Sequence, residues 1–256
     1  MSRLYEMEAI SEGLWVNARD SIIHALDHFF ERGQTRTNRS HHDKWIVLSV
    51  NHAAECICNM RLIALEPGNR LLNRTPRWFP SLSQTLSELR SPQLDAGLSP
   101  AERQLLVLMG KVSEIRHQLM HRIADDAMDV SVAAMCMVGM LKYIERFRGE
   151  TAADMVPWQS WPVESDVVAA IRYTKHQEYN DFVALFLGEK YGSQWLPTCP
   201  ACGVRAVTST VCEACYTELG SVECNECGDR AYYVELAYAK DGTARVECEC
   251  GAAQHI

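Results

Sequence analysis

One stretch of the chain combines an arginine and two histidines at a spacing that suits phosphodiester cleavage. His117 follows Arg116 directly, and His121 comes five positions after the arginine. An imidazole can transfer a proton near neutral pH, and a guanidinium can bind a phosphate through two parallel hydrogen bonds. The imidazoles would act as general base and acid, and Arg116 would stabilise the charge that develops on the phosphoryl oxygens. This chemistry needs no metal ion.

The Arg-x4-His spacing is short, so its surroundings must separate a site from coincidence. It occurs three times, at Arg19 and His24, at Arg36 and His41, and at Arg116 and His121. The first copy lies inside an expected helix and the second in a polar loop, whereas the third lies at an expected helix end. Side chains five positions apart on an ideal helix point about 140° apart, so fraying or a partner chain must bring the third pair together. Alternatively, Arg116 pairs with Glu114 or Asp125 and caps the bundle, and His121 is simply exposed.

Eight of the eleven cysteines form four close pairs near the end of the sequence. These pairs are Cys199 and Cys202, Cys212 and Cys215, Cys224 and Cys227, and Cys248 and Cys250. Such pairs are typical zinc ligands, and eight thiolates suffice for two tetrahedral sites with no open position. We therefore expect two structural Zn²⁺ ions that supply most of this module's folding free energy. Cysteines used in this way also indicate a reducing, cytoplasmic location.

Two arrangements remain for which cysteine pairs share one zinc ion. They could combine sequentially, the first with the second and the third with the fourth, or in crossed order, the first with the third. Residues 231–237 and 244–247 flank Lys240-Asp241-Gly242 and predict a β-hairpin between the last two pairs. That layout is similar to a zinc ribbon and favours sequential pairing.

The groups that could do chemistry must be positioned by helices. Apolar residues at helical spacing predict helices over residues 14–32 and 41–66, a third that starts at Ser99-Pro100, a fourth that ends at Gly149, and a further one over 164–187. The third helix carries Arg116 and His121. Residues 67–98 contain four prolines and are expected to be irregular. His24 and His28 are four positions apart, as zinc ligands can be, but no third ligand is evident nearby, which favours two ordinary histidines on a helix face.

The second helix is apolar nearly all round and should be central. Its polar exceptions, His52, Glu55 and Asn59, form one stripe. This stripe either reaches water or lines a catalytic groove, in which Glu55 would orient Arg116 or a histidine.

The irregular stretch contains a second set of candidates, for RNA binding. Three arginines precede an aromatic pair there, and the candidates are Arg70, Arg74, Arg77 and Trp78. Basic and aromatic side chains together suit single-stranded RNA, whose bases stack on rings. A packed loop with an aromatic anchor is the alternative.

Composition and charge divide the chain. Its 256 residues suit one large and one small domain, and we expect a bundle over 1–150, a connecting helical segment over 151–198 and a zinc module over 199–256. The bundle has 18 basic and 18 acidic residues, whereas residues 151–256 have 7 and 15. An acidic tail is a poor match for nucleic acid and suits a protein partner. The sequence has no apolar run long enough for a membrane span, and its start lacks the layout of a secretion signal.

The helix order and the motif placement resemble a HEPN domain over residues 14–149. The resemblance rests on Asn51-His52-Ala53-Ala54-Glu55 in an apolar helix, on Glu114-Ile115-Arg116-His117 and His121 at the end of a later one, and on the final apolar helix. In catalytic members of that superfamily, an Arg-x4–6-His motif forms a metal-independent endoribonuclease site. Two protomers usually contribute one motif each, across a dimer interface. Many members have Asn or Asp after the arginine, and His117 here leaves two candidate imidazoles.

The resemblance therefore implies a homodimeric endoribonuclease that cleaves RNA. It also implies a toxin or anti-phage defence effector, with an antitoxin or another regulatory protein as partner. The expected fold is mainly α, an up-and-down helical bundle followed by a small zinc-ribbon β module. The alternative is a non-catalytic HEPN-like adaptor whose zinc-ribbon tail recruits a protein.

Overall fold

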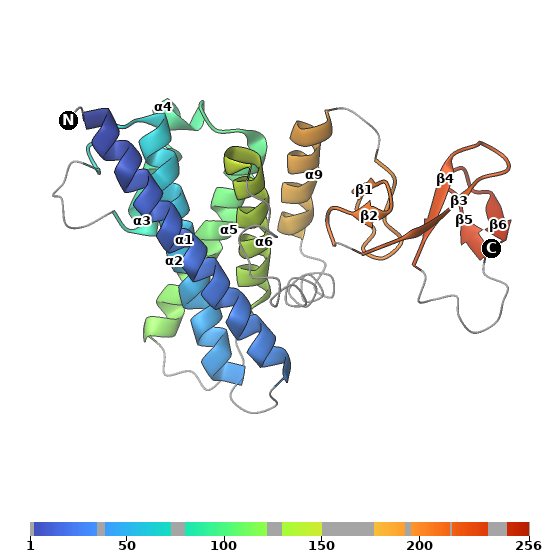
Figure 1. The fold of residues 1–256 in the computed structure, drawn as a ribbon, viewed down its shortest axis with the longest axis horizontal. Coiled ribbons are helices and arrows are strands. Elements are labelled where there is room, and N and C mark those ends of the chain that lie inside the picture. Colours follow the sequence, from blue (N-terminus) through green and yellow to red (C-terminus); the bar gives the residue numbers. More distant parts are fainter. Residues whose placement is uncertain are drawn as a thin grey trace. The chain divides into compact units, whose positions relative to one another are not determined.

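The computed structural model describes residues 3–34, 39–72, 80–121, 130–149, 177–192, 196–215, 217–234 and 245–255. The chain divides into two compact units, Met1–Ala170 and Ile171–Ile256. The described part of the first unit is helical, and that of the second has one helix and small two-stranded sheets (Figure 1). The prediction of a mainly α fold with a small β module is therefore confirmed. Across the described residues, no helix combines the length and the apolar character needed to cross a membrane.

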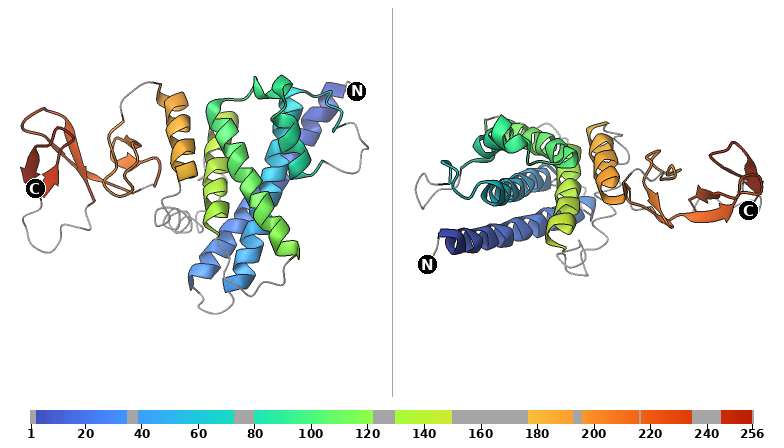
Figure 2. Two further views of the ribbon diagram at one scale, coloured as in Figure 1. Left: turned by 180° about the vertical axis from the view of Figure 1, so that it is seen from behind. Right: turned by 90° about the horizontal axis from the view of Figure 1, so that it is seen from above.

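The first unit is built around one central helix. Its helices are α1 (Arg3–Gln34), α2 (Arg39–Leu65), α3 (Leu82–Leu89), α4 (Pro92–Asp95), α5 (Pro100–His121) and α6 (Ser131–Arg148). Helix α2 contacts α1, α3, α5 and α6, and it lies between α1 and α5 (Figure 2). This arrangement confirms the central position expected from its apolar composition, because neighbouring helices bury most of its apolar side chains, and Asn59 of the polar stripe is buried as well.

Two local signals fix the ends of α5 and α6. The Ser99 hydroxyl accepts a hydrogen bond from the Glu102 N–H at 3.2 Å, and the Glu102 carboxylate accepts one from the Ser99 N–H at 2.7 Å. This reciprocal capping starts α5 where the sequence predicts it. Gly149 follows α6 with φ of 68°, a left-handed conformation that favours glycine and ends the helix as expected.

The stretch expected to be irregular contains two helices, α3 and α4, so the sequence missed them. Pro80 and Pro92 lie at the boundaries of these helices, since Pro80 precedes the N-cap Ser81 and Pro92 is the first residue of α4. Proline is tolerated in a first helical turn because its missing N–H would have no partner there. Helix α3 buries Leu82, Thr85, Leu86 and Leu89.

The second unit consists of α9 (Gln177–Tyr191) and three antiparallel strand pairs. The pairs are β1 (Val207–Thr208) with β2 (Val211–Cys212), β3 (Gly220–Glu223) with β4 (Arg230–Tyr233), and β5 (Arg245–Glu247) with β6 (Ala253–His255). The sequence predicted that residues 231–237 pair with residues 244–247 in a β-hairpin. The structure instead pairs the described part of the first stretch with β3, and β5 with β6, while the expected turn lies outside the described residues.

Candidate functional site

The eight cysteines form two groups of four, in sequential order. Within each group the sulfur atoms lie within 4.8 Å of one another. The sulfur pairs Cys199–Cys215, Cys202–Cys212 and Cys224–Cys250 are 3.7 Å apart, and Cys227–Cys248 is 3.6 Å apart. Sulfurs bound to one tetrahedral zinc ion at about 2.3 Å would be about 3.8 Å apart. The two groups could therefore each hold a metal ion, and the crossed arrangement is excluded.

Tight turns after the cysteine pairs bring the thiols together. In three of the four pairs the following residue is a glycine with positive φ, namely Gly203 (75°), Gly228 (77°) and Gly251 (87°). Each N–H donates to the carbonyl of a cysteine in the same pair, for example Gly203 to Cys199 at 2.8 Å. The Cys-Gly dipeptide is a sequence signal for these turns, because only glycine adopts this conformation without strain.

Polar side chains contact the sulfurs from outside. The Thr217 hydroxyl lies 3.1 Å from Cys215 Sγ, and the Gln254 amide donates to Cys224 Sγ at 3.2 Å. Gln254 is buried and its amide oxygen accepts from the Asn225 N–H at 3.3 Å. Such contacts stabilise thiolate charge and fix the orientation of ligands. The sequence gives no indication of Gln254, because its role depends on the pairing of β5 with β6.

The thiols of the first group influence one another's ionisation. Hydrogen bonds from Cys202 and Cys212 lower the pKa of Cys199 to about 7, whereas the interaction with Cys199 raises the pKa of Cys212. Four neighbouring thiolates repel one another, so they cannot all be ionised together without a cation among them. A divalent ion would allow every sulfur in the group to act as a thiolate ligand.

Helix α9 packs against the first cysteine group. The buried Tyr179 hydroxyl donates to the Ala214 carbonyl at 2.8 Å, next to Cys215. The Tyr191 hydroxyl donates to the Glu213 carboxylate at 3.1 Å, and the Lys190 ammonium lies 3.7 Å from the same carboxylate. This helix therefore belongs with the cysteine-bearing unit, as the division of the chain after Ala170 also indicates.

The candidate catalytic residues lie on the last turns of α5. Arg116 and His117 are exposed, so the structure does not support an Arg116 that is locked in the interior. His121 is the last residue of α5, and its side chain lies outside the described part of the structure. Met120, one turn after Arg116, is 63% exposed.

The other candidate residues lie elsewhere on the first unit. Glu55 accepts a hydrogen bond from the Leu82 N–H at 3.3 Å, at the start of α3, and the described contacts of its carboxylate do not include Arg116. Arg70 is exposed and lies 3.5 Å from the Glu88 carboxylate. Arg74, Arg77 and Trp78, predicted to bind RNA, lie outside the described residues.

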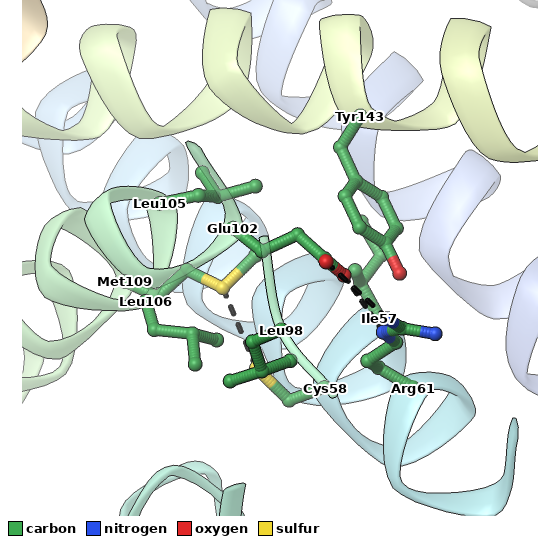
Figure 3. Close-up of a pocket in the computed structure, with 9 residues that line it drawn as sticks. All are labelled: Ile57, Cys58, Arg61, Leu98, Glu102, Leu105, Leu106, Met109 and Tyr143. Atoms are coloured by element: carbon green, nitrogen blue, oxygen red, sulfur yellow. Dashed lines mark hydrogen bonds and ion pairs between the residues drawn. The ribbon is translucent and has the colours of Figure 1, made fainter. Parts of the chain in front are cut away.

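A small cavity lies between α2, α5 and α6 (Figure 3). Its volume is about 20 Å³, room for about one water molecule. The Arg61 guanidinium and the Glu102 carboxylate pair on its wall, below the ring of Tyr143 (Figure 3). Burial raises the pKa of the Tyr143 hydroxyl, so this group stays protonated in the physiological range. The cavity is too small for a nucleotide, and we assign it a structural role.

Histidines that are distant in the sequence meet between α1 and α2. Ser21 Oγ lies 2.7 Å from His52 Nδ1, and His24 Nδ1 lies 2.8 Å from Ser49 Oγ. Nearer the end of α1, the Nδ1 atoms of His28 and His42 lie 3.0 Å apart. The sequence favoured an ordinary helix-face histidine at His28, because contact with His42 requires the antiparallel pairing of α1 and α2, which the sequence does not reveal. Burial lowers the pKa of His28, and the charge of the neighbouring His24 lowers it further.

Comparison with known proteins adds no family to this description: no family model, no curated protein and no solved structure matches the chain.

Proposed function

We propose that the chain is a metal-independent endoribonuclease of the HEPN type that acts as a homodimer. The observation that carries the proposal is the position of the motif, at the end of α5, with Arg116 and His117 both exposed. A phosphate of a long RNA can reach a guanidinium only where the side chain is open to solvent. The expectation from the resemblance and the exposure of these two side chains therefore agree.

The geometry of α5 favours a site shared between two copies. The helix continues to His121, and side chains five positions apart on a helix point about 140° apart. A second copy can supply the group that one helix cannot direct to the same point. Met120 supports such an interface, since it is one turn from Arg116 and is a large apolar side chain that is 63% exposed.

The proposed reaction is an internal transesterification. The 2′-oxygen attacks the adjacent phosphorus and loses its proton to one imidazole, while the bond from phosphorus to the 5′-oxygen breaks and a second imidazole protonates that oxygen. The products are a 2′,3′-cyclic phosphate and a 5′-hydroxyl. Arg116 would stabilise the charge on the phosphoryl oxygens, and the imidazoles would come from His121 and from either its copy or His117.

In this proposal each cysteine group holds one Zn²⁺ ion with a structural role. Four sulfur ligands fill a tetrahedral zinc ion and leave no position for a substrate. The spacing of the sulfurs supports this assignment, since two pairs in each group are 3.6 to 3.7 Å apart. The metal would stabilise the second unit and take no part in RNA cleavage.

The proposal is tested by incubating the full, zinc-loaded chain with a mixed RNA substrate in a buffer without added divalent ions. The variants are Arg116→Ala, His121→Ala and His117→Ala, and the control is Gln118→Ala, which alters an exposed residue of the same turn. We expect wild type and the control to release 2′,3′-cyclic ends. Arg116→Ala and His121→Ala should each lower the rate by about 10²-fold or more.

A non-catalytic adaptor is the second candidate, and the charge of the second unit favours it. Residues 171–256 carry 12 acidic and 7 basic residues, so this part of the chain suits a protein surface better than an RNA. Equal cleavage by wild type and the Arg116→Ala variant would remove the endoribonuclease proposal. Binding of a basic protein partner through the second unit would then be the function to pursue.

A further inference from the structure

Three potential metal ligands converge where α1 ends and α2 begins. His28 Nδ1 lies 3.0 Å from His42 Nδ1, and Glu31 Oε2 lies 3.4 Å from His42 Nδ1 and 3.6 Å from His28 Nδ1. Ligand atoms that surround one tetrahedral zinc ion at about 2.0–2.1 Å are about 3.3–3.4 Å apart. The three separations scatter around this value, so an ion just above the plane of the three atoms would need only small shifts of the side chains.

The fold holds these groups in place before any ion binds. His28 and Glu31 are three positions apart near the end of α1, and they therefore share a helix face. His42 lies in the first turn of α2, and the next residue, Asp43, is buried and forms an ion pair with Arg32 of α1. The two helices are thus fixed to each other beside the proposed ligands.

Neighbouring aromatic rings further restrict the two imidazoles. The Trp45 ring is nearly parallel to that of His28, with an interplanar angle of 9° and a centroid distance of 6.1 Å. The His41 ring is 5.6 Å from that of His42. A ring packed in this way cannot rotate freely, so its Nδ1 atom keeps facing the same point, as preorganised metal ligands do.

We propose that His28, Glu31 and His42 form a third metal site, which takes a divalent transition ion, Zn²⁺ in the first instance. Two imidazole nitrogens and one carboxylate oxygen suit zinc, cobalt and nickel better than magnesium or calcium, which prefer oxygen ligands alone. The histidine side chains are 14% and 11% exposed and the Glu31 side chain is 57% exposed, so an ion can enter from the glutamate side. Three protein ligands leave a fourth position for water or a small ligand.

The same three groups could instead form only a hydrogen-bonded cluster, in which one imidazole donates to the other. The two arrangements differ in what happens when metal is supplied. In a hydrogen-bonded cluster one Nδ1 atom keeps its hydrogen and no ion binds, whereas in a metal site both imidazoles carry their hydrogen on Nε2 and both Nδ1 atoms bind the ion together with a carboxylate oxygen.

The test uses the full chain without a histidine tag. One equivalent of Zn²⁺ is first supplied for each cysteine group, excess zinc is removed, and Co²⁺ is then titrated. We expect wild type to bind one Co²⁺ ion per chain, with visible d–d bands and without the charge-transfer band that thiolate ligands produce. His28→Gln and His42→Gln should lose this ion, and Glu31→Gln, which alters the most exposed ligand, should bind it more weakly.

His52→Gln is the matched control, because it removes an exposed imidazole of α2 that contacts Ser21 and none of the proposed ligands. It should bind Co²⁺ like wild type, and helicity measured by circular dichroism should show that each variant is folded. The inference is overturned if wild type binds no Co²⁺ beyond its cysteine groups, or if His28→Gln and His42→Gln bind as wild type does. RNA cleavage is not the readout, so this result is independent of the proposed endoribonuclease activity.

Discussion

Arg61 and Glu102 form a two-point ion pair between α2 and α5. Arg61 Nε lies 2.7 Å from Glu102 Oε1, and Arg61 Nη2 donates to Glu102 Oε2 at 3.2 Å. The side chains are 18% and 6% exposed. The same arginine donates to the Gly97 carbonyl at 3.0 Å, and the same glutamate caps the N-terminus of α5. One buried pair therefore fixes the start of the helix that carries Arg116.

Replacing Arg61 by Ala should destabilise the first unit strongly. The change leaves the Glu102 carboxylate buried without its cation, which costs about 3 kcal/mol in comparable pairs. The measurement is urea unfolding of the zinc-saturated chain, followed by circular dichroism. Arg103→Ala is the control, since the Arg103–Asp95 pair is exposed on both sides and should change the free energy of unfolding by less than about 1 kcal/mol. If the two variants lost the same free energy of unfolding, the Arg61–Glu102 pair would not be more important for stability than the exposed pair.

The cysteines of the helical unit should resist alkylation. Burial raises the pKa of Cys56 to about 12, against an ordinary value of 9.0, and it also raises the pKa values of Cys58 and Cys136. Only the thiolate reacts, and near pH 8 a rise of about three units lowers its population by about 10³-fold. After chelation of metal, mass spectrometry should show eight cysteines alkylated rapidly by iodoacetamide. Cys56, Cys58 and Cys136 should react when urea unfolds the protein or, slowly, as the pH rises.

Removing one hydroxyl from α9 should weaken metal binding at the first cysteine group. Tyr179→Phe leaves the buried Ala214 carbonyl without its donor, at a cost of about 1–2 kcal/mol. Because metal binding and folding of this unit are coupled, the affinity for zinc should fall by about tenfold in chelator competition. Tyr191→Phe is the control, since Glu213 keeps its contacts with Lys190 and Thr208, and its affinity should stay within about threefold of wild type. An unchanged affinity in Tyr179→Phe would mean that α9 does not support the cysteine group.

Gly220 should tolerate no side chain. A Cβ atom there would lie 2.3 Å from ring carbons of Tyr233, its partner across β3 and β4. Gly220→Ala should therefore cost about 1–3 kcal/mol and weaken zinc binding at the second cysteine group. The matched control is Gly188→Ala in α9, where a Cβ atom meets nothing within 4 Å and alanine favours the helix. A Gly220→Ala variant with the zinc affinity of wild type would show that Tyr233 moves aside easily.

Features that depend on neighbours in the sequence could be predicted, and features that depend on tertiary contacts could not. The start of α5 follows from Ser99 and Glu102, three positions apart, and the end of α6 follows from Gly149. The eight cysteine ligands were predicted because each pair lies in one short turn, whereas sequential grouping of the pairs was favoured and the crossed order stayed open. Helix α3 was missed because Pro80 and Pro92 were interpreted as signs of irregular structure, although both lie just outside its ends.

The histidine cluster and the role of Glu55 show the limit of sequence reasoning most clearly. His28 and His42 meet only because α1 and α2 run antiparallel at one particular register, which local patterns do not specify. Glu55 has the spacing of a groove residue, yet its carboxylate contacts the start of α3. Arg116 was placed at a helix end, and its exposure agrees with that prediction.

The contact of α9 with the first cysteine group has a practical consequence for dissecting the chain. A fragment that starts at Cys199 would lack the partner of the Ala214 carbonyl and the helix that ends at Tyr191. A fragment of the helical bundle that extends through α9 would carry Phe182 and Phe186, which are buried in the full chain, without the rest of their unit. To obtain two soluble fragments, the chain should therefore be divided before Gln177, close to the boundary after Ala170.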